Sequence, residues 1–386
     1  LSSMKSTAAM LKREPNDLES IRALRPNGPR RLWDKLKTVG LRDRMQGAWL
    51  GRAAGCTLGA PVEGWEVEKI EKLAERCGVP FPPVDFWPDH PAARYTINVS
   101  PASLKGQMLF VPTDDDLAYT ILGLIILERC GLDFTTDDVA RAWLKHVPIA
   151  WSAEEVTIRN LKAGIPPVKA AEKDNPYQEW IGADIRSDAW AYAAPGWPEK
   201  AAEYAYRDAY LSHRQNGIYG EMFFAAAISA AFAVDDPIEA LRIGLTEIPR
   251  NCRLANDVTR ALETGPRLKD WREARQMVDE RFGPMSEAHT NNNACLTVFG
   301  LILGGGNFTK TIGDIVAMGL DNDCTAATAG SLLGAVIGIQ NIPDHWWKPF
   351  RNRTRTYLED LEWFSNWDLV NRFVAMAKKT WGSNDR

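Results

Sequence analysis

Apolar residues recur at three- and four-residue spacing along nearly the whole chain from about Asp34, and this helical periodicity limits the fold more than any other feature. Gly, Pro or Asn residues separate the periodic segments, as they do between helices, whereas the two-residue alternation of half-buried strands is nearly absent. No internal repeat of solenoid length is present. The sequence therefore predicts a single all-α domain.

The composition excludes several classes of protein. The chain has 386 residues, 45% of them hydrophobic, which is enough for a large core. The longest apolar stretches, residues 117–127, 222–234 and 326–339, are shorter than the roughly 20 residues of a membrane span, and we expect them to be buried helices. A formal net charge of −4 provides no general attraction to nucleic acid or to anionic membranes. We therefore expect a soluble protein with neither nucleic-acid nor membrane partners.

The first 43 residues differ from the rest by a basic cluster at residues 25–37. We interpret them as a solvated N-terminal arm ahead of a single all-α domain at residues 44–386. Residues 1–3, which precede Met4, are interpreted as an expression remnant. The six cysteines lie far apart without paired CxxC spacing, which speaks against a disulfide framework or a zinc knuckle and favours a cytoplasmic location.

Three stretches break the helical pattern. Residues 79–105 contain many prolines, which cannot sustain a helix, and predict a long ordered loop of the kind that is often functional. Residues 164–176 and residues 289–293 are also predicted to be irregular.

A threonine and three acids, Thr113, Asp114, Asp115 and Asp116, stand directly before an apolar run. Taken alone this is the chemistry of a helix start, because Thr or Asp caps free backbone N–H groups and acids favour the positive end of the helix dipole. The arrangement returns near the other end of the chain, where residues 321–325 open a second helix rich in small residues. Two such starts on closely packed helices indicate more than capping.

Packing the two helix starts side by side would gather five carboxylates, and their repulsion would cost several kcal/mol unless protons or cations neutralised it. Carboxylates with a threonine hydroxyl suit Mg²⁺, Mn²⁺ or Ca²⁺ rather than zinc, and several shared carboxylates indicate a two-metal site. Gly51, Gly55 and Gly59 recur every fourth residue and leave a bare helix face on which another backbone can press. That face is compatible with an ordinary packing seam as well as with such a site.

These segments resemble the signature blocks of the ADP-ribosylglycohydrolase family. The three main blocks are GRAAGCTLGAPVEGW (residues 51–65), PTDDDLAYTILGL (112–124) and GLDNDCTAATAGSLLGAVIG (319–338). Two further blocks, EWIGADIRSDAW (179–190) and YLSHRQNGIYGE (210–221), stand where the family has other pocket segments. The resemblance spans about residues 44–339. It implies an all-α domain, a compact orthogonal bundle of many helices, whose cleft holds two Mg²⁺ or Mn²⁺ ions.

Matched residue by residue, the resemblance implies a metal-ligand set with the following members: Thr113, Asp114, Asp115, Asp321, Asp323 and Cys324. In such enzymes the metals orient the ribose hydroxyls and polarise water, while the bond at the anomeric carbon breaks through an oxocarbenium-like state. Asp116 has no counterpart among the ligand roles, and we interpret it as a complement to the helix dipole.

The resemblance also implies catalytic and substrate-binding residues. Glu63 closes the first block, and the implied catalytic residues are Glu63 and Asp115. Glu63 would act as general acid or base when its loop closes. Without the resemblance, Glu63 is interpreted as an exposed loop glutamate. The implied substrate-binding residues are Gly182, Arg186, Asp188 and His213, the last on a pocket-lining helix. Arg186 is expected to pair with a phosphate or with Asp188. A lone histidine is more often structural, so two roles stay open for His213: binding or orienting the substrate, or a purely structural role.

The chain departs from the family pattern at three positions. Cys56 stands where an acid is usual, Leu320 where glycine is common, and Cys324 where a Thr or Ser hydroxyl completes the second ligand set. A thiol is soft and binds Mg²⁺ poorly, so the second metal is expected to be weaker, completed by water, or different in identity.

The leading hypothesis is a metal-dependent hydrolase that cleaves an N- or O-glycosidic bond to ribose. Its partner would be an ADP-ribosylated protein or a smaller ribosyl compound. The alternative is a non-catalytic protein that binds ADP-ribose or a nucleotide, or a structural relative of the family. Retention of Glu63 and of the five metal-site carboxylates favours catalysis. A purely helical interaction protein would leave the clustered acids unexplained.

Overall fold

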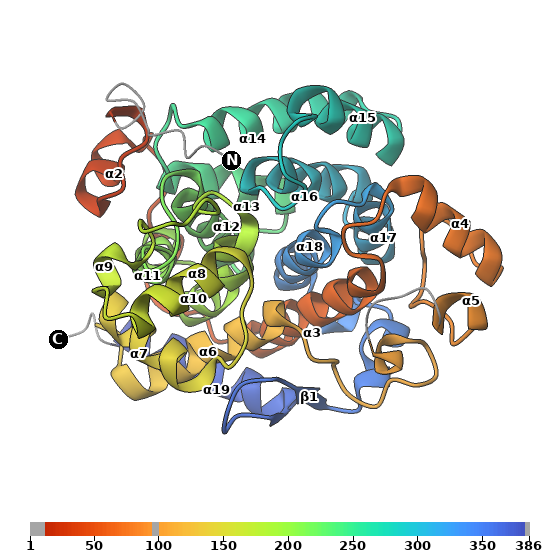
Figure 1. Ribbon diagram of the computed structural model, residues 1–386, viewed down its shortest axis with the longest axis horizontal. Helices are drawn as coiled ribbons and strands as arrows, with labels where there is room; N and C mark the ends of the chain where they lie inside the picture. Colours follow the sequence, from red (N-terminus) through yellow and green to blue (C-terminus); the bar gives the residue numbers. More distant parts are fainter. Residues whose placement is uncertain (1–11, 95–99, 383–386) are drawn as a thin grey trace.

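Helix follows helix along the chain, as the apolar periodicity predicts (Figure 1). The computed structural model describes residues 12–94 and 100–382, so the proposed expression remnant at residues 1–3 lies outside the described residues. Within these ranges the only extended strands are two short ones, and the predicted all-α fold is confirmed.

The α-helices of the first half are α2 (Leu18–Leu24), α3 (Leu41–Gly59), α4 (Val67–Cys77), α5 (Pro91–Arg94), α6 (Asp115–Cys130), α7 (Thr136–His146), α8 (Ser152–Lys162), α9 (Pro167–Ala170) and α10 (Ser187–Ala193). Those of the second half are α11 (Pro198–Ala209), α12 (Asn216–Ala231), α13 (Pro237–Gly244), α14 (Arg253–Thr264), α15 (Trp271–Phe282), α16 (Thr290–Gly304), α17 (Phe308–Met318), α18 (Asn322–Ile337) and α19 (Asn366–Gly382). Short 3₁₀ turns join several of them, among them η1 (Ala60–Val62), η2 (Pro101–Ser103) and η3 (Ile181–Arg186). The strands are β1 (Arg353–Arg355) and β2 (Trp363–Ser365).

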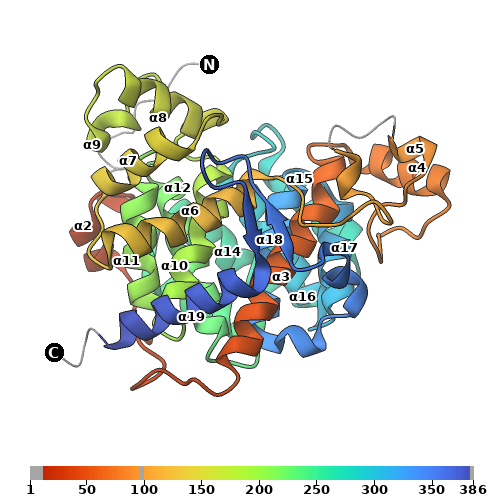
Figure 2. The same ribbon diagram turned by 90° about the horizontal axis from the view of Figure 1, so that it is seen from below.

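The three long apolar stretches form α6, α12 and α18, which lie in the interior (Figures 1 and 2). Every residue of α12 is buried. A helix apolar on all sides is stable only when other helices surround it, and this explains why the remaining helices are arranged around these three. No helix in the described ranges is both long and apolar enough to cross a membrane.

Helices α3 and α18 run side by side through the middle of the molecule (Figures 1 and 2). A Cβ atom added at any glycine of the α3 face would collide with the backbone of α18, so only glycine permits this approach. The facing pairs are Gly51 with Gly330, Gly55 with Ala326 and Gly59 with Asp323. The predicted bare helix face is confirmed, and its last pair fixes Asp323 against the end of α3.

The N-terminal arm packs against the helical body. Arg25 and Arg30 both pair with Glu247, a carboxylate with no exposed side-chain surface. Arg31 lies over the rings of two tryptophans, and Trp33 is buried in the core. The expectation of a solvated arm is therefore wrong, because a buried acid and aromatic faces provide partners for its cations.

Two of the three stretches predicted to be irregular contain little regular structure. In the proline-rich segment at residues 79–105 the described parts form a loop with only α5 and η2, and residues 164–176 contain only the single turn of α9. The indole Nε1 of Trp87 in the first loop donates to the carbonyl of Leu58 (3.0 Å), which ties this loop to the end of α3.

The expectation for residues 289–293 is wrong, because α16 begins at Thr290. His289 caps this helix, its Nδ1 accepting the backbone N–H of Asn291 at 3.1 Å. The amide of Asn293 donates to the carbonyls of Glu287 and His289, so the polar run supplies the hydrogen bonds of a helix start instead of breaking it.

The β1–β2 hairpin braces the entry to α6. Its strands pair antiparallel with Thr354 opposite Phe364. The segment before α6 pairs with β1 in turn: Val111 N–H donates to Arg353 O at 2.8 Å and Arg355 N–H donates to Val111 O at 3.1 Å. Figure 2 shows the hairpin beside the start of α6. The chain is thereby held in place just before its first acid-rich helix start.

Candidate metal centre

The first acid-rich helix start is capped by its own side chain. Asp114 is the N-cap of α6, and its carboxylate accepts the backbone N–H of Asp116 at 3.0 Å. Thr113 precedes it and is exposed, while Asp115 and Asp116 form the first turn of the helix. The helix start predicted from the sequence is therefore present, with Asp114 as its cap.

The second start has an unusual backbone. Gly319 and Leu320 both have a positive φ, of 70° and 60°, immediately before the N-cap residue Asp321. Leucine rarely adopts this left-handed conformation, which explains why glycine is the usual residue at this position of the family pattern. The backbone N–H of Asp321 donates to Asn293 Oδ1 at 3.3 Å, and the carbonyl of Leu320 accepts the N–H of Gly64 at 3.0 Å. The loop of Glu63 is thus bound to the start of α18.

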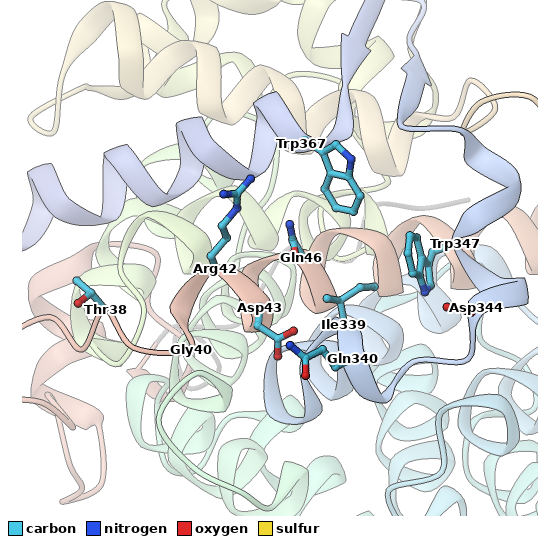
Figure 3. A pocket seen from close by; sticks show the side chains of 10 residues that line it. All are labelled: Thr38, Gly40, Arg42, Asp43, Gln46, Ile339, Gln340, Asp344, Trp347 and Trp367. Atoms are coloured by element: carbon cyan, nitrogen blue, oxygen red, sulfur yellow. The ribbon is translucent and has the colours of Figure 1, made fainter.

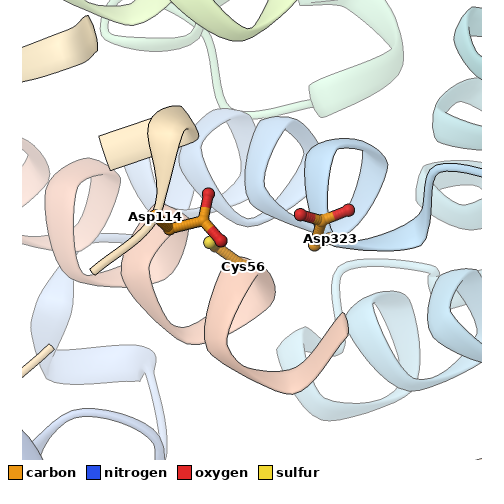
Figure 4. A group of neighbouring side chains, drawn as sticks. All are labelled: Cys56, Asp114 and Asp323. Carbon is orange, nitrogen blue, oxygen red and sulfur yellow. The ribbon is translucent and has the colours of Figure 1, made fainter. Parts of the chain in front are cut away.

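The two helix starts meet. Ligand atoms of Glu63, Asp321 and Asp323 lie within 4.8 Å of one another, and so do those of Asp114, Asp115 and Asp116. The two groups are joined because Asp323 also lies within 4.8 Å of Asp114, in a set completed by Cys56. Figure 4 shows that these three residues come from α6, α3 and α18. The predicted gathering of five carboxylates is found, with Glu63 beside it.

The acids repel one another strongly. Burial, followed by the charge of Asp116, raises the pKa of Asp114 to about 6. Burial and Asp115 raise the pKa of Asp116 to about 7, although Arg52 acts against them. Asp115 and Asp323 have pKa values well above the ordinary range for the same two causes, burial and neighbouring carboxylates. Such a cluster needs protons or cations to be stable at neutral pH.

Glu63 lies at the edge of the cluster with an exposed side chain. Removal of water by the surrounding residues, followed by the charges of Asp321 and Asp114, raises the pKa of Glu63 to about 9. Without cations Glu63 therefore holds a proton at neutral pH. Bound divalent cations would lower this pKa again, because they stabilise the carboxylate.

Two oxygen atoms indicate where cations fit. Asp321 Oδ1 and Asp323 Oδ1 are buried and have no hydrogen-bond partner among the described residues. Buried carboxylate oxygens without a partner are rare because they cost free energy, and each calls for a proton or an ion. Hard oxygen donors with free lone pairs are the ligands that Mg²⁺ and Mn²⁺ prefer, so the residues present fit such ions.

Asp116 is part of a buried ion cluster. Arg52 of α3 donates to Asp116 Oδ1 at 2.9 Å and pairs with Asp188 Oδ2 at 2.7 Å, and none of the three side chains is exposed. The thiol of Cys324 donates to Asp116 Oδ2 at 3.1 Å. The interpretation of Asp116 as a mere complement to the helix dipole is therefore wrong. Sequence reasoning missed Arg52, whose signal was a lone charge within the small-residue run GRAAG.

Arg186 lies in a second buried cluster. It pairs with Glu154 Oε1 at 2.5 Å, with Asp208, and with Glu221 Oε2 at 3.5 Å. The expected alternative of a pair with Asp188 is wrong, because Asp188 pairs with Arg52. A Cβ at Gly182 would lie 2.5 Å from the carboxylate of Glu154, so this glycine makes room for the cluster. A phosphate would have to displace one of these carboxylates to reach Arg186, and the substrate-binding roles of Gly182, Arg186 and Asp188 stay predictions.

His213 lies in the turn between α11 and α12, so its predicted place on a helix is wrong. It is fully buried, with Nδ1 2.7 Å from Ser212 Oγ and 4.0 Å from Glu154. Burial and the charges of Arg186 and Arg214 hold the pKa of His213 well below its usual range. His213 is therefore a neutral group beside the Arg186 cluster, and its substrate-binding role stays a prediction.

Three groups near the acids were not found from the sequence. Asp184 is 1% exposed, and neither of its carboxylate oxygens has a hydrogen-bond partner in the described part of the chain. Burial, and to a lesser degree the charge of Asp321, raises its pKa. Among the described residues the buried hydroxyls of Tyr119 and Tyr357 also have no partner, and burial, with a smaller contribution from the charge of Asp115, raises the pKa of both. Asp184 sits inside the block at residues 179–190 and could have been noticed there, whereas nothing in the sequence places Tyr357 near α6.

Two hollows lie along α3. A small one of about 90 Å³ borders the acids and is lined in part by Cys56, Asp114 and Arg355. A larger one of about 680 Å³ lies at the other end of α3, where Asp43 and Trp347 are among its lining residues (Figure 3). About 20 Å of helix separates Asp43 from Cys56 at 1.5 Å per residue, so the larger hollow is not part of the acid cluster.

The family model described as ADP-ribosylglycohydrolase matches residues 37–380, which is most of the chain. The chain belongs to the ADP-ribosylglycohydrolase family. A solved structure entitled "ADP-ribosylglycohydrolase-related protein complex" has a similar fold, with a TM-score of 0.59 and 20% sequence identity over 89% of this chain and 99% of that chain. At this identity the likeness shows the fold alone. No curated protein matches the sequence. ADP-ribosylglycohydrolases are in general metal-dependent hydrolases, which agrees with the acid cluster.

Proposed function

We propose that this member of the ADP-ribosylglycohydrolase family is a metal-dependent hydrolase that cleaves an N- or O-glycosidic bond at the anomeric carbon of ribose. The substrate would be an ADP-ribosylated protein or a smaller ribosyl compound, and two Mg²⁺ or Mn²⁺ ions would be its cofactors. The observation that carries the proposal is the meeting of two helix starts, where buried oxygens of Asp321 and Asp323 have no hydrogen-bond partner within residues 12–94 and 100–382. Their charge requires cations that the ribose hydroxyls can then share.

The residues that would hold the cations are Thr113, Asp114, Asp115, Asp321 and Asp323. When bound, the cations would orient the ribose hydroxyls and polarise water at the anomeric carbon. The carboxylates left uncompensated would stabilise the positive charge that develops on the ribose ring as the bond breaks. The site is therefore suited to a reaction whose transition state is cationic.

Glu63 would donate or accept the proton in the reaction. Its raised pKa keeps it protonated before the cations bind, and its exposed position lets a substrate reach the carboxyl group. As a general acid it would give a proton to the leaving group, and as a base it would accept one from water. The hydrogen bond from Gly64 N–H to Leu320 O holds this loop at the start of α18, within reach of the ligands.

The test is hydrolysis of ADP-ribosyl-arginine, ADP-ribosyl-serine, O-acetyl-ADP-ribose and simple ribosides with and without a chelator. We expect metal-dependent release of ADP-ribose from at least one ADP-ribosyl compound, or of ribose from a simple riboside, and a roughly 10²- to 10⁴-fold lower kcat in Glu63→Gln. Glu66→Gln, which changes another exposed glutamate of the same segment, is the matched control and should be as active as the wild type. Equal activity of Glu63→Gln would remove Glu63 from the mechanism. Binding without turnover of any substrate would favour the non-catalytic alternative.

A further inference from the structure

The following inference rests on the proposed metal-dependent function and concerns the atoms that hold one of the cations. Two of the six cysteines, Cys56 and Cys324, lie among the acids, and both are buried. Each replaces an oxygen-bearing residue of the family pattern. Their surroundings nevertheless differ.

The thiol of Cys56 is hydrogen-bonded to Asp114. Cys324 contacts a different acid. Its thiol donates to Asp116 Oδ2 at 3.1 Å, and the same carboxylate is held by Arg52. The sulfur of Cys324 also lies within 4.8 Å of a carboxylate oxygen of Asp323. Its other acid, Asp116, is already neutralised by Arg52, whereas Asp114 beside Cys56 has no ion pair among the described residues.

Cys56 also lies between the two acid-rich helix starts, next to a different acid of α6. Its sulfur is within 4.8 Å of a carboxylate oxygen of Asp114 and one of Asp323, which also lie within that distance of each other. Figure 4 shows the sulfur next to Asp114, with Asp323 opposite. These donors come from three different helices, so the packing of the whole domain maintains their arrangement.

A second observation also indicates a ligand at this place. Asp323 is only 2% exposed, and its Oδ1 has no hydrogen-bond partner among the described residues. The hollow of about 90 Å³ is lined by Cys56 and Asp114 but not by Asp323, so it provides room for water on one side of the proposed ion.

The dimensions suit a thiophilic ion. Zinc binds thiolate sulfur at about 2.3 Å and carboxylate oxygen at about 2.0–2.2 Å, so its tetrahedral ligand atoms lie roughly 3.5 Å apart. The donors of Cys56, Asp114 and Asp323 lie within 4.8 Å of one another without an ion, so reaching this spacing requires them to close by at most about 1.3 Å. Three protein ligands leave a fourth position for water or substrate, as in catalytic zinc sites.

We propose that Cys56, Asp114 and Asp323 form a thiolate–dicarboxylate site for a thiophilic divalent cation of the Zn²⁺ or Co²⁺ type at one of the two metal positions. Binding breaks the S–H bond of Cys56, forms a sulfur–metal bond and releases the proton to solvent. Because Mg²⁺ is a poor partner for thiolate, it binds this position weakly and occupies the all-oxygen position beside Asp321.

The first test uses Co²⁺ as the probe. Metal-free protein is titrated with Co²⁺ and the near-ultraviolet band of thiolate-to-cobalt charge transfer is recorded. We expect the band in the wild type and in Cys324→Ser, and its loss in Cys56→Ser. Cys295→Ser, which changes another buried thiol outside the acid cluster, is the control and should retain the band. Zn²⁺ should abolish the band at equimolar amounts, and excess Mg²⁺ should not.

Affinity provides the second readout. Cys56→Ser should bind Zn²⁺ roughly tenfold or more weakly, while its affinity for Mg²⁺ changes little. X-ray absorption of the zinc-loaded wild type should show one sulfur at about 2.3 Å, and this measurement needs no variant to fold. A wild type that binds Mg²⁺ but shows neither band nor sulfur overturns the thiolate site and leaves the proposed function intact. Loss of the band in Cys324→Ser alone would also overturn it, and a wild type that binds no metal would overturn both proposals.

Discussion

Gly55→Ala tests whether the contact between α3 and α18 sets both the stability of the domain and the geometry of the metal centre. In an isolated helix alanine is favoured over glycine by about 1 kcal/mol. Here the new Cβ would meet the carbonyl group of Ala326 and the backbone nitrogen of Ala327, and none of these atoms can rotate away. The helices must therefore separate by about 1 Å, at an overpacking cost of roughly 3 kcal/mol. We expect a net loss of about 2 kcal/mol.

The same separation would move Asp323 away from Asp114, because Asp323 lies one turn before Ala326, at the start of α18. Ligands displaced by about 1 Å no longer meet one ion, so we expect at least roughly tenfold weaker Mg²⁺ binding. Denaturant unfolding measures the first effect and calorimetry the second.

Gly47→Ala is the matched control, because its Cβ would meet the backbone of residues 334–339 at the other end of the same helix pair. It should lose similar stability and much less metal affinity. If Gly55→Ala were instead about 1 kcal/mol more stable than the wild type, helix propensity alone would decide the outcome and the close approach would be refuted.

Three further outcomes follow from the buried charges. Arg52→Met should lower the free energy of unfolding by about 3–5 kcal/mol, because it leaves the carboxylates of Asp116 and Asp188 buried without their cation. Arg52→Lys should retain part of that stability. Denaturant unfolding would contradict the prediction if both variants were as stable as the wild type. The pKa values of Asp114 (about 6) and Asp116 (about 7) are raised, so the folded protein binds more protons than the unfolded chain between the ordinary carboxyl pKa and about pH 7. Metal-free protein should therefore lose stability as the pH rises through this range. Unfolding midpoints that rise with pH in the presence of chelator would contradict the prediction. Mg²⁺ or Mn²⁺ at 100 times its Kd should raise the free energy of unfolding by about 2.7 kcal/mol in the wild type and not in Asp321→Asn, and an equal rise in both would place the ion elsewhere.

The parts of the fold that the sequence predicts correctly are those recorded within single helices. The periodicity of α6, α12 and α18 lies in adjacent residues, and the glycines of α3 recur on one face, so local inspection finds both. The two acid-rich helix starts are also local patterns. Their meeting could be predicted because small residues allow the two helices to pack closely. Five carboxylates gathered in this way are stable only when protons or cations neutralise their charge.

The parts that could not be predicted depend on partners far away in the chain. Arg186 appears in the sequence next to Asp188, yet its partners Glu154, Asp208 and Glu221 belong to three other helices. Residues 289–293 are poor helix formers taken singly, but the cap by His289 and the contacts of the side-chain amides favour a helix start. Tertiary contacts of this kind have no local signal.

The docking of the N-terminal arm affects how the limits of this domain are drawn. The family match begins at residue 37, after Arg25 and Arg30 of the arm and before the start of α3. A chain shortened to that boundary would keep Glu247 but lose Arg25 and Arg30, the two cations that pair with this fully buried carboxylate. An unpaired buried charge is strongly destabilising, so such a shortened protein should fold poorly. Residues that lie outside the shared family region are in this case required to complete its core.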